Sequence, residues 1–112
     1  MGTLRFRAVG IVREEGTGLP VAGVRVCAYD RDLVIDDPLG EVTTAADGRF
    51  EIVFTDLAFR DVIEQRPDLY LRVLEVGSER ELLSTRHDTR YDARSQEYFE
   101  LAIVKERLTR DS

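Results

Sequence analysis

The sequence predicts an all-β fold, a seven-stranded antiparallel β-sandwich with one short α-helix at about residues 56–66. Short segments with an apolar residue at every second position recur along the chain, which is typical of strands buried on one face. Glycine, proline and aspartate separate these segments at short intervals, as in sandwiches and barrels. One stretch alone has apolar residues at helical spacing. With 112 residues, we expect a single domain over residues 1–112.

The first two strands are predicted at residues 4–12 and 24–28. In the first, the even positions carry apolar or small residues, namely Leu4, Phe6, Ala8, Gly10 and Val12. In the second, apolar residues alternate with a more polar set, namely Arg25, Cys27 and Tyr29. The intervening segment EEGTGLPVAG is rich in glycine and contains a proline, so it predicts a turn, as in a hairpin.

The next two strands are predicted at residues 41–44 and 49–54, after the loop DRDLVIDDPLG. Asp47 and Gly48 lie between these strands, and Asp-Gly between β-type segments is a strong hairpin signal. Phe50, Ile52 and Phe54 share one face of the second strand. We therefore predict that these three side chains lie in the core.

The rest of the chain is predicted to hold a helix and three strands. Thr55 or Asp56 can cap the helix, and Pro67 ends it. Its apolar residues at helical spacing are Phe59, Val62 and Ile63. Strands are predicted at residues 69–73, 82–85 and 99–103. Residues 86–97 are polar and predict a long loop or a frayed helical turn, and the charged tail at residues 105–112 is predicted to be frayed.

Composition excludes several classes of function. Sixteen Lys and Arg against 22 Asp and Glu give a formal charge of −6, which repels nucleic acid and anionic membranes. No apolar run approaches the roughly 20 residues that span a bilayer, and the amino terminus lacks the apolar centre of a signal peptide. We therefore expect a soluble protein, cytoplasmic by default. Cys27 is the single cysteine, which excludes an intramolecular disulfide.

Three segments of residues 10–75 carry a family resemblance, namely GIVREEGTGLPVAGVRVCAYDRD, DDPLGEVTTAADGRFEI and RPDLYLRV. They resemble the transthyretin-like, or prealbumin-like, superfamily, which includes the carboxypeptidase regulatory-like domains. The resemblance implies a Greek-key sandwich of prealbumin type. Members of this kind are found as modules of larger bacterial proteins, usually without chemistry of their own. The resemblance therefore implies a scaffold and names no substrate.

One enzymatic branch of that superfamily, the 5-hydroxyisourate hydrolases, relies on histidines, an arginine and a carboxy-terminal Tyr-Arg-Gly-Ser. This chain ends in LTRDS and has His87 as its single histidine, which argues against that activity. Iron dioxygenases with a related sandwich need two tyrosines and two histidines at the metal, and one histidine cannot supply them. A divergent hydrolase is kept as a further alternative to a non-catalytic protein.

Four aspartates lie close together on one predicted loop, namely Asp30, Asp32, Asp36 and Asp37. Loops rich in carboxylate oxygens provide the ligands of Ca²⁺, although this spacing is not that of an EF-hand. Aspartate also favours turns, because its side chain accepts hydrogen bonds from nearby backbone amides. The turn interpretation is preferred, and a Ca²⁺ site on these four residues is the alternative.

Other residues whose side chains could bind a ligand or react have simpler explanations. Arg86, Arg90 and Arg94 recur every four residues and would share one face of a helix that binds an anion or a carboxylate surface. Interleaved aspartates favour a solvated loop instead. His87 lies in this polar stretch and is interpreted as a surface residue. Arg25 could lower the pKa of Cys27, but a half-buried cysteine of a sheet explains it equally well.

Several large side chains fall on the strand faces opposite the core, namely Tyr29, Val53, Tyr70 and Leu74. The predicted helix covers only one sheet, so we expect a homo-oligomer or a partner protein on the other. Tyr29, Tyr70 and Leu74, together with the three arginines above, are the candidates for partner binding. The sequence thus predicts a non-catalytic protein-interaction or scaffold module without a cofactor. The alternative is a Ca²⁺-dependent ligand-binding domain.

Overall fold

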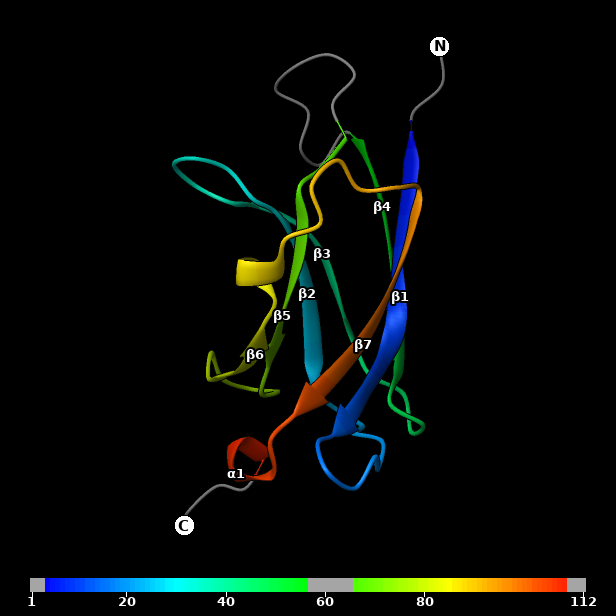
Figure 1. Cartoon of the computed structure of the whole chain (residues 1–112), viewed down its shortest axis with the longest axis vertical. Coiled ribbons are helices and arrows are strands. Elements are labelled where there is room, and N and C mark those ends of the chain that lie inside the picture. The colour runs from blue at the N-terminus through cyan, green and yellow to red at the C-terminus, as the bar shows by residue number, and fades with distance from the viewer. Residues whose placement is uncertain (1–3, 57–65, 109–112) are drawn as a thin grey trace.

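The computed structural model describes residues 4–56 and 66–108, which form two β-sheets packed face to face (Figure 1). One sheet has the strand order β4-β1-β7 and the other the order β3-β2-β5-β6. The strands are β1 Arg5–Glu14, β2 Arg25–Asp30, β3 Asp37–Thr43, β4 Arg49–Thr55, β5 Leu69–Leu74, β6 Glu81–Ser84 and β7 Gln96–Ile103. The 3₁₀-helix η2 spans Arg86–Asp88, and the one-turn helix α1 spans Lys105–Leu108. The predicted all-β sandwich is confirmed.

The core lies between the two sheets and is built from alternate residues of each strand. Phe50, Ile52 and Phe54 of β4 are buried while their neighbours along the strand are exposed, as predicted. The ring of Phe54 stacks on that of Phe6, with centroids 5.4 Å apart. The facing sheet contributes a matching set from β2 and β5, namely Val26, Ala28, Leu71 and Val73. Because full burial of such an aliphatic or aromatic side chain contributes roughly 1.5–3 kcal/mol, these rows hold the sheets together.

Strand β1 is the centre of the three-stranded sheet and has neighbours of opposite direction. It pairs antiparallel with β4 and parallel with β7. The prediction of a wholly antiparallel sandwich is therefore wrong for the pair of β1 and β7. The cause is the path of the chain after β6, because residues 85–95 cross to the end of the molecule where β1 begins (Figure 1). Strand β7 starts at that end and runs alongside β1 in the same direction.

Strands β1 and β7 come unusually close at Gly10. A Cβ atom at this position would lie 2.0 Å from the carbonyl oxygen of Phe99 and 2.9 Å from Cζ of Phe50. Glycine alone leaves room for both the backbone of β7 and the Phe50 ring. The small residue that the sequence places in the first strand is thus required for close packing of the three strands.

The connection between β2 and β3 is shorter than predicted. Strand β2 continues to Asp30 and β3 begins at Asp37, so these two aspartates face each other as the last pair of the ladder. A bulge between Ala28 and Tyr29 shifts the register just before this point. Residues 31–36 remain as a loop, which projects from the side of the four-stranded sheet, away from β1 and β4 (Figure 1).

Several expectations concern the segments outside the strands. The helix predicted at residues 56–66 falls almost entirely outside the described residues. Residues 105–108 of the tail form α1, where Arg107 Nη1 donates to the carbonyl oxygen of Glu81 at 3.0 Å and Leu108 packs against the core. The frayed tail stays a prediction. Residues 86–97 contain η2 and the first residues of β7. Within residues 4–56 and 66–108, no helix is long and apolar enough to cross a membrane.

Candidate functional site

The outward face of the four-stranded sheet carries a row of cations and aromatic rings. Tyr29 of β2 and Tyr70 of β5 are opposite each other in the ladder, and their rings stack with centroids 5.3 Å apart. The guanidinium of Arg86 lies 5.8 Å from the Tyr70 ring centroid, and that of Arg72 lies 5.8 Å from the Tyr29 ring centroid. We call these four residues the Arg–Tyr stack. A cation over an aromatic ring contributes about 0.5–1 kcal/mol at a solvent-exposed site, so the stack stabilises this face.

Asp36 connects the Arg–Tyr stack to the loop at residues 31–36. Its carboxylate accepts hydrogen bonds from the Tyr70 hydroxyl, from Arg86 Nε at 2.9 Å and from the backbone N–H of Asp32 at 3.0 Å. The Arg86 guanidinium holds the pKa of Asp36 well below its usual range. Burial, together with the hydrogen bond to Asp36, raises the pKa of Tyr70 to about 12. The ionised carboxylate is therefore a firm anchor for the base of the loop.

The far end of this loop exposes three successive apolar side chains, which we call the apolar tip. Leu33, Val34 and Ile35 are 100%, 88% and 73% exposed. The backbone N–H of Leu33 donates to Asp32 Oδ1 at 2.6 Å, so both ends of the loop turn are hydrogen-bonded. Contiguous large apolar side chains in water mark interaction sites on folded proteins. The sequence prediction concentrated on the aspartates and missed this tip, although the uninterrupted run Leu-Val-Ile within a turn segment was a signal for it.

The structure gives the four loop aspartates separate roles. Asp30 accepts a hydrogen bond from the backbone N–H of Asp68 at 2.8 Å, and burial raises the pKa of Asp30 to about 6. Asp32 and Asp36 hold the loop turn, as the turn interpretation expects, and Asp37 begins β3. In the part of the chain that the structure describes, no group of three or more histidine, cysteine or carboxylate side chains could hold a metal ion. No observation therefore favours the Ca²⁺ alternative.

The three arginines do not form a common anion site. Arg86 belongs to the stack, whereas the guanidinium carbon of Arg90 lies 3.8 Å from the ring centroid of Phe99. Arg90 Nη1 also donates to the carbonyl oxygen of Tyr98 at 2.6 Å. Arg94 is exposed elsewhere on the same connection. Helical spacing does not apply here, because the 3₁₀-turn ends at Asp88 and Arg90 bridges to Leu69 in β geometry.

The remaining predicted partner-binding residues are largely covered by this chain itself. Tyr70 and Leu74 are 3% and 1% exposed, and Tyr29 is half-buried in the stack. Arg25 lies across the same face, with its Nη atoms 3.0 Å from a Glu41 carboxylate oxygen and 3.3 Å from one of Glu79. The outward face of the four-stranded sheet is therefore internally paired, and Tyr70 and Leu74 are not available to a partner.

Cys27 and His87 lack the surroundings of catalytic groups. The Cys27 side chain is buried, and its Sγ lies 3.7 Å from Glu41 Oε1. Burial raises the pKa of the Cys27 thiol, which disfavours the thiolate that a nucleophile needs. His87 is exposed on η2. Neither geometry resembles an activated nucleophile or a positioned base.

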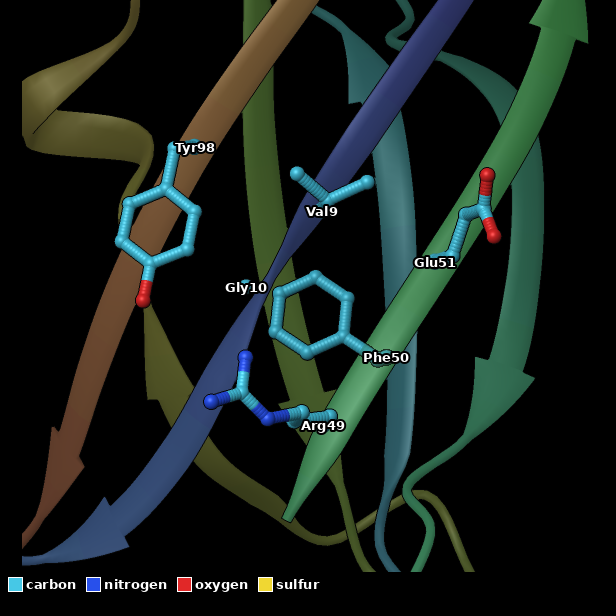
Figure 2. A pocket seen from close by; sticks show the side chains of 6 residues that line it. All are labelled: Val9, Gly10, Arg49, Phe50, Glu51 and Tyr98. Atoms are coloured by element: carbon cyan, nitrogen blue, oxygen red, sulfur yellow. The ribbon is translucent and has the colours of Figure 1, made fainter. Parts of the chain in front are cut away.

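A shallow depression of about 380 Å³ lies on the three-stranded sheet, and we call it the Gly10 depression (Figure 2). Its lining residues come from β1, β4 and β7, namely Val9, Gly10, Arg49, Phe50, Glu51 and Tyr98. Val9 lies in register between Glu51 on one neighbouring strand and Tyr98 on the other. Gly10 and the ring of Phe50 lie at the centre of the depression, with the side chains of Arg49 and Glu51 beside them (Figure 2).

The chain folds as a small β-sandwich domain of two sheets, and the comparisons with known proteins concern its fold alone. No family model matches the chain, and no curated protein sequence matches it. A 9R-lipoxygenase from Cyanothece PCC8801 has a similar fold, with 23% identity and a TM-score of 0.56 over 90% of this chain. The chain spans 16% of that lipoxygenase, so the likeness concerns one part of a larger protein.

A second solved structure with a related shape is the dioxygenase domain of a dioxygenase and carbohydrate-binding protein fusion from the cellulolytic bacterium Streptomyces sp. SirexAA-E. Its identity is 15% and its TM-score 0.46, over 92% of this chain and 80% of that one. A likeness this remote says nothing of activity. The transthyretin-like resemblance stays a prediction.

Proposed function

We propose that this chain is a non-catalytic protein-interaction module that binds its partner through the apolar tip. The exposure of Leu33, Val34 and Ile35 carries the proposal. Among the residues that the structure describes, these side chains belong neither to the buried core nor to the residues packed against it, so packing of that core does not explain them. Transfer of such side chains from water into a partner's pocket contributes roughly 1.5–3 kcal/mol each, which is enough for a weak but specific complex.

The anchoring of the loop supports the same proposal. Asp36 fixes the base of the loop through Tyr70 and Arg86, and Asp32 closes the turn beside Leu33. A loop held near its bound conformation loses less conformational entropy when a partner binds. Disordered apolar residues would lack this advantage. The geometry around the tip is thus suited to presenting a short apolar element.

The charges around the tip favour a protein partner over a membrane. Residues 30–37 contain four aspartates and one arginine, which gives a formal charge of −3 on a chain of −6. The cytoplasmic surfaces of membranes are anionic and would repel such a loop. A protein pocket with an apolar floor and basic residues at its rim would bind it.

A photo-crosslinking residue at Val34 tests the proposed function in the protein's native source. We expect covalent adducts with a protein partner, which mass spectrometry identifies. The matched control carries the same residue at Val76, which is 54% exposed in the turn between β5 and β6. Adducts at neither position, or equally at both, would overturn the proposal. Binding of the purified chain to phosphatidylcholine and phosphatidylserine vesicles, lost in Leu33→Asp, would replace a protein partner by a membrane.

A further inference from the structure

We propose that the partner of the apolar tip is a second copy of this chain, bound at the Gly10 depression. This inference rests on the proposed function and names its binding partner. It follows from two surfaces of the molecule that complement each other and lie on opposite layers of the sandwich.

The first argument is the distribution of exposed apolar side chains. Besides the apolar tip, the three-stranded sheet exposes Val53 and Tyr98 at 51% and 48%. Val9 on the central strand is half-buried, lies in register with Tyr98, and has Glu51 as its partner on β4, two residues before Val53. Val9 and Tyr98 line the Gly10 depression, whose volume of about 380 Å³ is sufficient for two or three aliphatic side chains. The protruding tip and the depression are thus matched in polarity and size.

The second argument is charge. The outward positions of β1, β4 and β7 carry four arginines and two glutamates, which gives this face a formal charge of +2; the six are Arg5, Arg7, Arg13, Arg49, Glu51 and Glu100. The chain as a whole has a charge of −6, and the loop at residues 30–37 has −3. Opposite potentials at two surfaces steer association and fix its orientation. Arg49 lines the depression itself, where it would face the aspartates of the docked loop.

The positions of the two surfaces determine the kind of assembly. The loop projects from the four-stranded sheet, and the depression lies on the outward face of the three-stranded sheet (Figures 1 and 2). One pair of molecules can therefore make only one such contact, and each end stays free to bind another copy. Contacts of this head-to-tail kind produce open chains and not closed dimers. A contact made mainly by three side chains is expected to bury less than the roughly 800 Å² per partner of a standard interface, so we expect weak association.

Sedimentation velocity of the purified full chain tests this inference. We expect the weight-average mass to rise continuously, at least about twofold between roughly 10 μM and 1 mM, and to fall again at high salt because charge complementarity is screened. A constant monomer mass at every concentration would overturn the inference, and so would a plateau at the mass of a dimer. The crosslinking at Val34 remains decisive for the proposed function in either case, since its adducts reveal any other partner.

Two variants separate the two surfaces. Leu33→Asp places a negative charge in the apolar tip and leaves the depression intact, whereas Tyr98→Glu places a negative charge in the depression and leaves the tip intact. Each variant alone is expected to stay monomeric, and an equimolar mixture to form a dimer that grows no further, because only one functional contact remains. Both positions are exposed, at 100% and 48%, so circular dichroism should show an unchanged fold. Val76→Asp is the matched control and should associate like the unmodified chain. A mixture that stays monomeric would contradict the head-to-tail contact.

Discussion

The two outward faces of this sandwich carry similar residue types in different states. On the four-stranded sheet, Tyr29 and Tyr70 stack on each other, and arginines paired with Asp36 and Glu81 cover them. On the three-stranded sheet, Tyr98 is 48% exposed and lines the Gly10 depression. The aromatic and charged side chains of the first face therefore find their contacts within one chain. The second face leaves apolar and cationic groups in water.

The difference shows that the residues opposite an aromatic side chain on the adjacent strands decide whether its ring is exposed to a partner. Tyr29 and Tyr70 are directly opposite each other, so each ring covers the other. Tyr98 has Val9 as its neighbour on β1, and the next position of β1 is Gly10. A tyrosine at an outward strand position is therefore not by itself evidence of an interface. Substitutions confined to one face at a time test this difference.

The largest expected effect is the contrast between two tyrosine truncations. Tyr70→Ala removes a 3% exposed ring from the Arg–Tyr stack and leaves the Asp36 carboxylate without its hydroxyl partner. We expect a loss of about 3 kcal/mol in the free energy of unfolding, measured by urea denaturation with circular dichroism. Tyr98→Ala, at 48% exposure, should change it by less than about 0.5 kcal/mol. Equal effects would show that the two faces do not differ as described.

Gly10→Ala tests the close approach beneath the second face. The added Cβ would collide with the Phe99 carbonyl oxygen and with the Phe50 ring, so β7 must move away from β1. We expect a cost of about 2 to 3 kcal/mol in the same denaturation experiment. Gly77→Ala is the control, because its φ of +83° is strained for alanine while no atom lies within 4 Å. The control should cost about 1 kcal/mol, and a similar value for Gly10→Ala would disprove the steric argument.

Alternation of side chains was sufficient to predict most of the strands and the core. Phe50, Ile52 and Phe54 are buried as expected, because a period of two assigns each side chain to one face regardless of its neighbours. The same pattern carries no information on strand direction. Strand β7 has the predicted alternation yet runs parallel to β1, because the path of residues 85–95 sets its direction. Prediction of that path requires knowledge of tertiary contacts.

The candidate site was predicted less well, and for a physical reason. Tyr70 and Leu74 have outward positions, but Asp36 and the arginines that cover this face come from distant parts of the sequence. Arg86, for example, lies 50 positions from Asp36 along the chain and 2.9 Å from it in space. The apolar tip, in contrast, is local and contiguous. The sequence pattern did not predict the tip, because the flanking aspartates alone are sufficient to indicate a turn and side-chain exposure within a turn is not periodic.

Asp36→Ala tests whether the ion pair between Asp36 and Arg86 stabilises the first face. The substitution removes the hydrogen bonds to Tyr70, Arg86 and Asp32 and should cost about 1 to 2 kcal/mol. Because the folded state depresses the pKa of Asp36, this contribution is present above about pH 4 and disappears as the pH falls further. Hydrogen exchange should also show faster exchange at residues 32–36.

The control for this ion pair lies on the other face. Glu51→Ala breaks the pair with Arg7, whose side chains are 46% and 49% exposed. It should cost less than about 0.5 kcal/mol, since exposed pairs contribute little. If the two substitutions cost the same, Asp36 is an ordinary surface charge and the loop is not anchored through it.

The smallest expected effect is a pH dependence at the edge of the first face. Burial raises the pKa of Asp30 from an ordinary 3.8 to about 6, so the folded state binds a proton more tightly than the unfolded chain does. The resulting stabilisation is complete below about pH 4 and is lost as the pH rises through about 6, the opposite of the Asp36 effect. Asp30→Asn keeps an acceptor for the Asp68 N–H and removes the titration.

Thermal unfolding between pH 4.5 and pH 7.5 measures this difference. Relative to Asp30→Asn, the unmodified chain should be more stable at the lower pH than at the higher one, by ~1 kcal/mol after solvent screening of a partly exposed group. A profile for Asp30→Asn that runs parallel to that of the unmodified chain would mean that Asp30 is ionised throughout. The four-stranded face would then be as open to water at this edge as the three-stranded face is around Tyr98.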